Sequence, residues 1–213
     1  MEFERLMEVV GDQPVFETSL LLAGDADRAN VHRQLSRWTK AGRLYQLRRG
    51  LYALAPPFQK VEAHPFFVAN RLVQPSYVSL QSALSYYGLI PEAVPVTTSV
   101  TTSRPGRWDT SLGGYVFRHI KTELFRDYRL LEVDDDQEAF VASPEKALLD
   151  LIYLTPGADS AAYLKELRLQ NLEALDLDRL QDEAGLTRRP KLQRAVARVA
   201  ALARSEMTEY ETL

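Results

Sequence analysis

Seven basic residues and no acidic residue lie between positions 28 and 58 of this chain, although its 213 residues carry a net charge of −3. Guanidinium and ammonium groups bind phosphate oxygens, and arginine also reads the acceptor edge of guanine. Because phosphate binding follows the local electric field and not the total charge, this segment predicts a nucleic-acid interface. The seven bases are Arg28, Arg33, Arg37, Lys40, Arg43, Arg48 and Arg49.

The first of these bases belong to a predicted helix over residues 27–41. Val31, Leu35 and Trp38 recur at i, i+4 and i+7 and form one apolar stripe. Asp25 or Asp27 would cap the start of the helix by accepting from free backbone N–H groups. The face opposite the stripe carries Ala29, Arg33, Ser36, Arg37 and Lys40, with Asn30 and His32 on its flanks.

A short β-hairpin is predicted after this helix, with strands over residues 44–47 and 51–54. Tyr45 and Leu47 would face the same side, and Gly50 would supply the positive φ at the turn. Arg48 and Arg49 make the tip of the hairpin cationic. A basic helix followed by a cationic hairpin is typical of the recognition helix and wing of a winged helix-turn-helix.

We expect two further helices before the basic helix, over residues 3–10 and 15–23, and a tight turn at Gly24-Asp25. The resulting order of helix, helix, turn, helix and hairpin is that of a winged helix-turn-helix. Trp38 is then expected in the core and not against a base. Asn30, Arg33, Ser36 and Arg37 would reach base edges or nearby phosphates, while Lys40, Arg48 and Arg49 would hold the backbone. The complete set expected to contact DNA is Arg28, Asn30, His32, Arg33, Ser36, Arg37, Lys40, Arg48 and Arg49. The alternative interpretation is an ordinary solvated helix face.

The whole chain predicts an α+β fold of two domains, an N-terminal winged helix-turn-helix over residues 1–57 and a larger mixed α/β domain over residues 58–213. Pro56 and Pro57 mark a linker at about residues 55–60, because proline stiffens the chain and removes donors. The second domain would be mixed α/β over 58–155 and mainly helical over 156–213. Strands are expected over 96–102, 114–120, 128–133 and 138–142, with a loop over 103–113. Helices are expected from Pro65, from Leu80, after Ser143, and over 160–169, 178–184 and 190–203.

A second group of bases lies near the end of the chain, where the last helix is expected. Six bases and no acid occur between residues 188 and 204. They would form a solvated helix face, or else a second surface for nucleic acid or an acidic partner. The candidates for that surface are Arg188, Arg189, Lys191, Arg194 and Arg198.

The sequence offers no support for an enzyme, a metal or a cofactor. It has no cysteine, and His32, His64 and His119 lack the spacing of a metal site. Neither a nucleophile elbow nor a P-loop is present. No apolar run approaches the length of a membrane span, and no export signal is recognisable, so we expect a cytoplasmic protein.

Four segments of the chain resemble the AbiEi-type antitoxins of type IV toxin–antitoxin systems. They are the early winged helix that ends in residues 47–54 (LRRGLYAL), residues 77–88 (YVSLQSALSYYG), the Thr-Thr strand near Val100, and residues 143–150 (SPEKALLD). The last segment is the most specific, and the likeness spans roughly residues 15–155. The stretch from Glu145 to Asp150 would be either a structural helix start or a functional site.

The resemblance implies a two-domain protein that binds inverted repeats in its own promoter and represses its operon. Residues 58–213 would be the antitoxin domain, which counters a nucleotidyltransferase-like toxin encoded beside it without forming a stable complex. One alternative is a winged-helix regulator with a sensory second domain and no toxin, which the neighbouring gene would distinguish. Another is an enzyme targeted to DNA by the winged helix, which metal-dependent cleavage of DNA would reveal.

Overall fold

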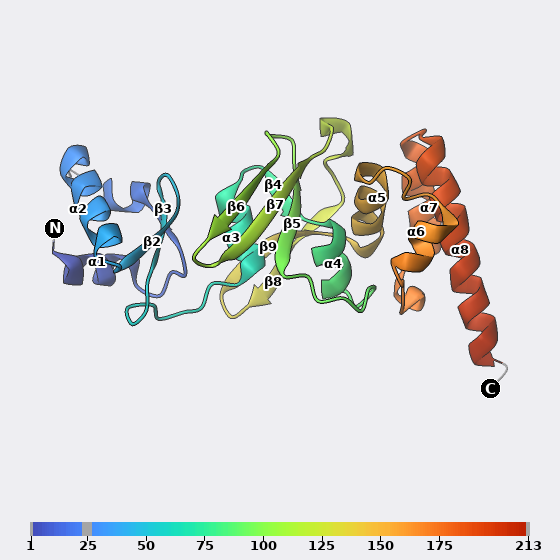
Figure 1. Ribbon diagram of the computed structural model, residues 1–213, viewed down its shortest axis with the longest axis horizontal. Helices are drawn as coiled ribbons and strands as arrows, with labels where there is room; N and C mark the ends of the chain where they lie inside the picture. Colours follow the sequence, from blue (N-terminus) through green and yellow to red (C-terminus); the bar gives the residue numbers. More distant parts are fainter. Residues whose placement is uncertain (1, 23–26, 212–213) are drawn as a thin grey trace.

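The computed structural model describes residues 2–22 and 27–211. The molecule is elongated, with a small N-terminal unit at one end, a six-stranded sheet in the middle and a group of helices at the other end (Figure 1). The fold is therefore α+β, as the sequence predicts. The expected turn at Gly24-Asp25 lies outside the described residues.

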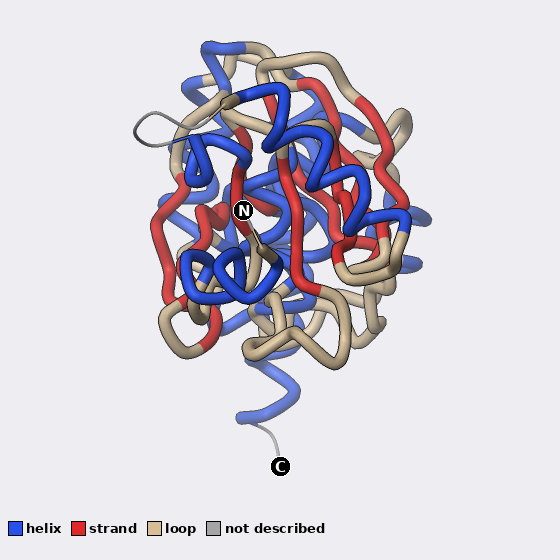
Figure 2. The backbone as a smooth tube through the Cα atoms, turned by 90° about the vertical axis from the view of Figure 1, so that its left-hand side faces the viewer, coloured by secondary structure: helices blue, strands red, loops and turns tan. Residues whose placement is uncertain are grey.

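The N-terminal unit is built from α1 (Phe3–Val10), β1 (Phe16–Glu17), the 3-10 helix η1 (Thr18–Leu22), α2 (Arg28–Lys40), β2 (Leu44–Arg48) and β3 (Leu51–Leu54). The three strands form an antiparallel sheet in the order β1-β3-β2. Figure 2 views the molecule from this end, with the unit in front of the central sheet. Helices joined to a hairpin in this order fit a winged helix-turn-helix.

The predicted helix over residues 15–23 is wrong at its start, where Phe16 and Glu17 form β1 and join the hairpin, and only Thr18–Leu22 is helical, as a 3-10 helix. Phe16 pairs with Tyr52, and their rings stack with centroids 5.9 Å apart. The Thr18 N–H donates to the Gly50 carbonyl at 2.9 Å. Pairing with a distant strand therefore outweighs the local helical pattern of the apolar residues.

The central sheet has the order β6-β7-β5-β4-β9-β8 and mixes parallel and antiparallel pairs. The predicted strands are confirmed to within about two residues at either end. The strands are β4 (Ser76–Val78), β5 (Val96–Thr101), β6 (Gly106–Thr110), β7 (Gly113–His119), β8 (Tyr128–Asp134) and β9 (Gln137–Ala142).

The prediction of a loop over residues 103–113 is wrong at β6. This outermost strand places Trp108 edge-on against Phe117, with ring centroids 5.1 Å apart. Arg107 and Asp109 point to solvent on the other side and form an ion pair of 2.8 Å. The sequence pattern did not predict β6 because the segment is rich in turn residues and has only one large apolar side chain, Trp108, on its inner face.

Helices flank this sheet and then form the far end of the molecule, so the expected change to mainly helical structure is confirmed. α4 and α5 lie between the sheet and the last helices (Figure 1). The helices are α3 (Pro65–Leu72), α4 (Leu80–Tyr86), α5 (Pro144–Leu154), α6 (Ala161–Glu166), α7 (Leu177–Leu186) and α8 (Pro190–Glu211), with short 3-10 helices η2 (Thr122–Leu124) and η3 (Leu172–Ala174).

The β2–β3 hairpin is buried on both of its faces. Leu44, Tyr52 and Leu54 belong to the core of the N-terminal unit. Leu47 and Leu51 belong instead to the larger core, which continues through the central sheet into the C-terminal helices. The hairpin thus lies between two cores. The domain boundary near residue 57 stays a prediction.

Candidate nucleic-acid interface

Helix α2 is fixed at its start by Asp27 and along its inner side by three apolar residues. The Asp27 carboxylate accepts a hydrogen bond of 3.0 Å from the Ala29 N–H, which satisfies one of the free donors of the first turn. Val31, Leu35 and Trp38 are buried. The Phe3 ring packs edge-on against Trp38, so this tryptophan is a core residue as predicted. The opposite side of α2 must therefore face outward.

We call the outward side of α2 its basic face, and it holds every helix residue expected to contact DNA. Within the described part of the chain, the side chains of Arg28, Arg33 and Lys40 have no hydrogen-bonding or ion-pair partner. Arg37 lies with its guanidinium carbon 5.9 Å from the centroid of the Trp38 ring. Cations that no internal acid neutralises can take an external anion. The exposed residues of the basic face are Arg28, Asn30, His32, Arg33, Ser36, Arg37 and Lys40.

The two arginines at the hairpin tip differ in their surroundings. Arg49 is exposed, beside a turn in which Gly50 adopts a φ of 84°. Arg48 is half-buried, and its Nε and Nη2 donate to the Arg71 carbonyl of α3 at 3.3 and 3.2 Å. A further contact of 3.5 Å joins Arg48 to the Glu17 carboxylate. Arg48 therefore connects the hairpin to the central part of the molecule.

This role of Arg48, and the second buried face of the hairpin, are features that sequence reasoning missed. One signal was present, because residues 51–54 form an uninterrupted apolar run. A strand with one solvated face alternates between polar and apolar residues, whereas a strand buried on both faces does not. The run from Leu51 to Leu54 thus indicated a covered hairpin.

The second basic surface lies on and before α8, at the opposite end of the molecule from α2 (Figure 1). Most of its side chains bind other parts of the chain. Arg194 donates to the Asp159 carboxylate at 3.0 and 2.8 Å, and Arg198 to the Asp159 carbonyl. Lys191 donates to the Thr155 carbonyl, and burial lowers the pKa of this lysine.

The two remaining bases of this surface behave differently. Arg189 lies against the Tyr153 ring, with its guanidinium carbon 4.8 Å from the centroid, and contacts Glu123 at 3.4 Å. Arg188 is exposed. These contacts hold α8 and the residues before it against α5 and against the loop after α5. They favour a structural role for these bases over a second binding surface.

The start of α5 contains a buried group of charges. Lys146 and Asp150 form an ion pair, and the Asp150 carboxylate also accepts from the Tyr77 hydroxyl at 3.0 Å and the Ser79 hydroxyl at 2.9 Å. Burial raises the pKa of Asp150, while Lys146 and the two hydroxyls oppose that rise. Burial likewise raises the pKa of Tyr77. The hollow that Lys146 and Asp150 line has a volume of about 20 Å³, less than one water molecule occupies in the liquid, which favours a structural role.

The candidates for other chemistry have ordinary partners. His64 caps α3, where its Nδ1 accepts from the Phe66 N–H at 3.2 Å, and His119 Nδ1 lies 3.1 Å from the Ser103 carbonyl. Within residues 2–22 and 27–211, no three histidine, aspartate or glutamate residues gather as a metal site would require. No helix of that part of the chain has the length and apolarity needed to cross a membrane.

Residues 17–55 match the family model described as "Transcriptional regulator, AbiEi antitoxin". The matched segment begins at the last residue of β1 and contains η1, α2 and the β2–β3 hairpin, and thus both the basic face and the arginines at the hairpin tip. The resemblance to AbiEi-type antitoxins is confirmed for this segment. No curated protein matches the chain.

Proposed function

We propose that this protein is a DNA-binding transcriptional regulator that represses its own operon. The observation that carries the proposal is the basic face of α2, whose side chains are exposed on a helix anchored from behind by Leu35 and Trp38. The major groove of DNA is about 12 Å wide and admits one α-helix. The family match of the same segment supports this assignment.

The residues of the proposed interface would have three roles, which are contact with bases, contact with phosphates and positioning of the hairpin. Arg33 and Arg37 would bind base acceptors or phosphates, while Asn30 and Ser36 would contact base edges. Lys40 and Arg49 would bind backbone phosphates. Arg48 would act as a positioning residue, because its guanidinium is engaged by the Arg71 carbonyl and Glu17.

We further propose that the protein is the antitoxin of a type IV toxin–antitoxin pair and works in the cytoplasm. The description of the matched family model supports an antitoxin role. The partner would be a nucleotidyltransferase-like toxin encoded beside it, countered without a stable complex. Co-expression tests this role, since the neighbouring gene product should arrest growth alone and not with this protein. Arrest that persists despite soluble expression of both proteins contradicts it.

Binding to the protein's own upstream DNA tests the regulator proposal. Fluorescence anisotropy of a labelled upstream fragment should give tight binding that weakens steeply with salt, and a scrambled fragment of equal length should bind more weakly. Each phosphate contact contributes about 0.9 to the slope of log affinity against log salt. Equal affinity for both fragments at every salt concentration would contradict specific regulation.

Four variants locate the interface within that assay. Arg33→Ala/Arg37→Ala should lose specific binding, and Arg49→Ala should reduce the salt slope by about one. Arg48→Ala should weaken binding with little change of slope, because it removes an internal contact and no phosphate contact. The matched control is Arg104→Ala, an exposed arginine in the loop between β5 and β6, which should bind like the wild type. If the double variant also binds like the wild type, α2 is not the recognition helix.

A further inference from the structure

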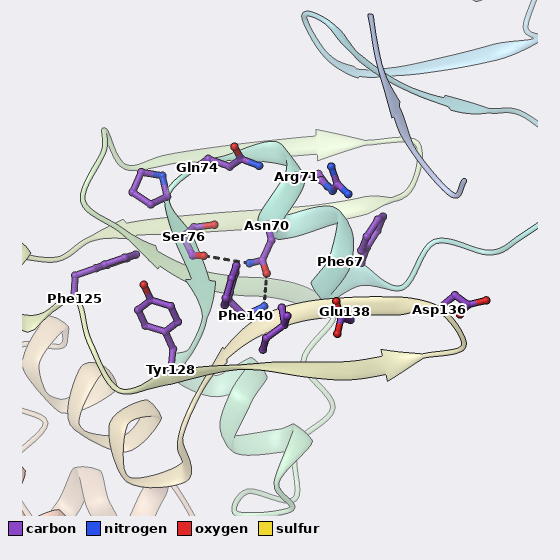
Figure 3. A pocket seen from close by; sticks show the side chains of 12 residues that line it. Phe67, Asn70, Arg71, Gln74, Ser76, Phe125, Tyr128, Asp136, Glu138 and Phe140 are labelled. Atoms are coloured by element: carbon purple, nitrogen blue, oxygen red, sulfur yellow. Dashed lines mark hydrogen bonds between the residues drawn. The ribbon is translucent and has the colours of Figure 1, made fainter. Parts of the chain in front are cut away.

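A groove with a volume of about 770 Å³ lies where β8, β9 and the start of β4 meet the end of α3 (Figure 3). Much of its wall is aromatic, formed by Phe67, Phe125, Tyr128 and Phe140. It contains no residue of the basic face of α2 or of the hairpin tip. The groove is therefore a feature that the proposed DNA interface does not use.

Asn70 fixes the floor of the groove. β4 and β9 are parallel and pair only at Val78 and Val141, so they part before that point. The Asn70 side chain spans the gap, accepting from the Phe140 N–H at 2.6 Å and donating to the Ser76 carbonyl at 3.4 Å (Figure 3). Both backbone groups are thus satisfied without closing the sheet, and the groove is preformed.

The groove exposes two apolar side chains directly opposite each other on neighbouring strands. Leu130 of β8 is 49% exposed and its partner Phe140 of β9 is 43% exposed. Tyr128 holds the adjacent wall, stacking on Tyr77 with centroids 4.6 Å apart and meeting Phe140 edge-on. Exposed apolar residues on an outermost strand are typical of surfaces that another polypeptide covers.

The hairpin that forms one side of the groove is strongly acidic. We call the exposed carboxylates of Glu132, Asp134, Asp135, Asp136 and Glu138 the acidic tip. None of these carboxylates has an ion-pair partner within the described part of the chain. Glu132 and Glu138 face each other in register, which places like charges directly opposite and destabilises the hairpin. A cationic partner would relieve this repulsion, whereas a nucleic acid would be repelled.

We propose that this groove docks a short basic segment of a partner protein. An aromatic or aliphatic side chain of the segment contacts Leu130 and Phe140, and its lysine or arginine side chains face the acidic tip. Charge of opposite sign speeds the encounter and disfavours acidic competitors, and the apolar contact supplies area removed from water. The inference does not rest on DNA binding.

A random-peptide library displayed on phage tests the proposal with the full-length protein as the target. Phage that also bind the Leu130→Ser/Phe140→Ser variant are removed before sequencing. We expect the retained peptides to combine an apolar residue with flanking lysine or arginine. Retained peptides that are neutral or acidic, or the absence of any groove-dependent peptide, would overturn the proposal.

One retained peptide is then synthesised and labelled. Its affinity for variants of the protein distinguishes a loss of charge from a loss of folded structure. Glu132→Gln/Glu138→Gln should weaken binding of this peptide about 2-fold to 30-fold. This is the loss expected when two exposed ion pairs between peptide and protein are removed. The variant should be at least as stable as the wild type, because the repulsion between the strands is removed. Leu186→Ser, at an exposed leucine of α7, is the matched control and should bind normally.

Two results in this second assay oppose the proposal. Unchanged affinity of the glutamine variant would show that the acidic tip takes no part. Competition by a single-stranded oligonucleotide for the same groove would show an anion site instead. Failure of upstream DNA to bind α2 would leave both peptide measurements as they are, so the two proposals fail independently.

Discussion

Single polar side chains connect elements that are far apart in this chain. Asn70 joins β4 to β9, Arg48 joins the hairpin to α3, and Asp150 of α5 accepts hydrogen bonds from Tyr77 and Ser79 around β4. The hydrogen bonds of Asp150 are buried, whereas those of Arg48 to the Arg71 carbonyl and of Asn70 to the Phe140 N–H are exposed. Because a buried unpaired group costs more free energy than a hydrogen bond gains, Asp150 is the most sensitive of the three positions.

The buried ion pair gives a prediction at the residue scale. Lys146→Met leaves the Asp150 carboxylate buried without its counterion, and we expect the free energy of unfolding to fall by about 3–5 kcal/mol. Lys146→Met/Asp150→Asn removes both charges, keeps an acceptor for the hydroxyls and should recover much of that loss. Urea denaturation followed by circular dichroism measures both. Equal stability of the two variants would show that the charge itself is unimportant.

At the scale of elements, α2 is a helix whose inner face is fixed and whose outer face is free. Its apolar stripe and its contact with Phe3 lie away from the basic face, and its cap uses only the backbone N–H of Ala29. The helix can therefore change stability without changing the residues offered to DNA. The β2–β3 hairpin is different, because its two faces contribute residues to two separate cores while Arg49 at its tip is exposed.

The cap of α2 gives the prediction at this scale. Asp27→Ala removes the acceptor of the Ala29 N–H and should lower the free energy of unfolding by about 1 kcal/mol, within a range of about 0.5–2 kcal/mol. Asp27→Asn is the matched control, since asparagine caps as well as aspartate. Thermal unfolding measures stability, and the salt slope of DNA binding should stay unchanged. Equal melting temperatures of Asp27→Ala and wild type would mean that this hydrogen bond contributes nothing.

At the scale of the whole molecule, two hydrophobic cores share one hairpin. Leu44 and Tyr52 serve the N-terminal core, and Leu47 and Leu51 serve the larger one. The Arg48 contact with α3 lies at the same junction. The hairpin tip is therefore held in a fixed relation to the central sheet.

Separating the two parts should reveal this sharing. A fragment of residues 1–60 loses the cover over Leu47, Leu51 and Ala53, which are 5%, 0% and 2% exposed in the whole chain. We expect the fragment to bind the dye ANS, to self-associate in analytical ultracentrifugation and to unfold more readily than the full chain. A monomeric fragment as stable as the full chain would instead support an independent domain at residues 1–57.

Features of this protein that depend on residues close together along the chain can be predicted from its sequence. The period of Val31, Leu35 and Trp38 predicts α2 and its buried side, and therefore also its basic face. Ser143 and Pro144 predict the start of α5, where the Ser143 hydroxyl accepts from the Lys146 N–H. The same holds for the tip of the β2–β3 hairpin, which needs the positive φ of Gly50.

Features that depend on partners far away along the chain become visible only once the chain is folded. Phe16 lies in a strand because Tyr52 is beside it, and Arg48 turns inward because the Arg71 carbonyl lies within reach. Leu130 and Phe140 form one exposed pair only because β8 and β9 adopt this register. Side-chain periodicity reports which face of an element is apolar, but it carries no information about which segment covers that face. That choice depends on the packing of the whole chain.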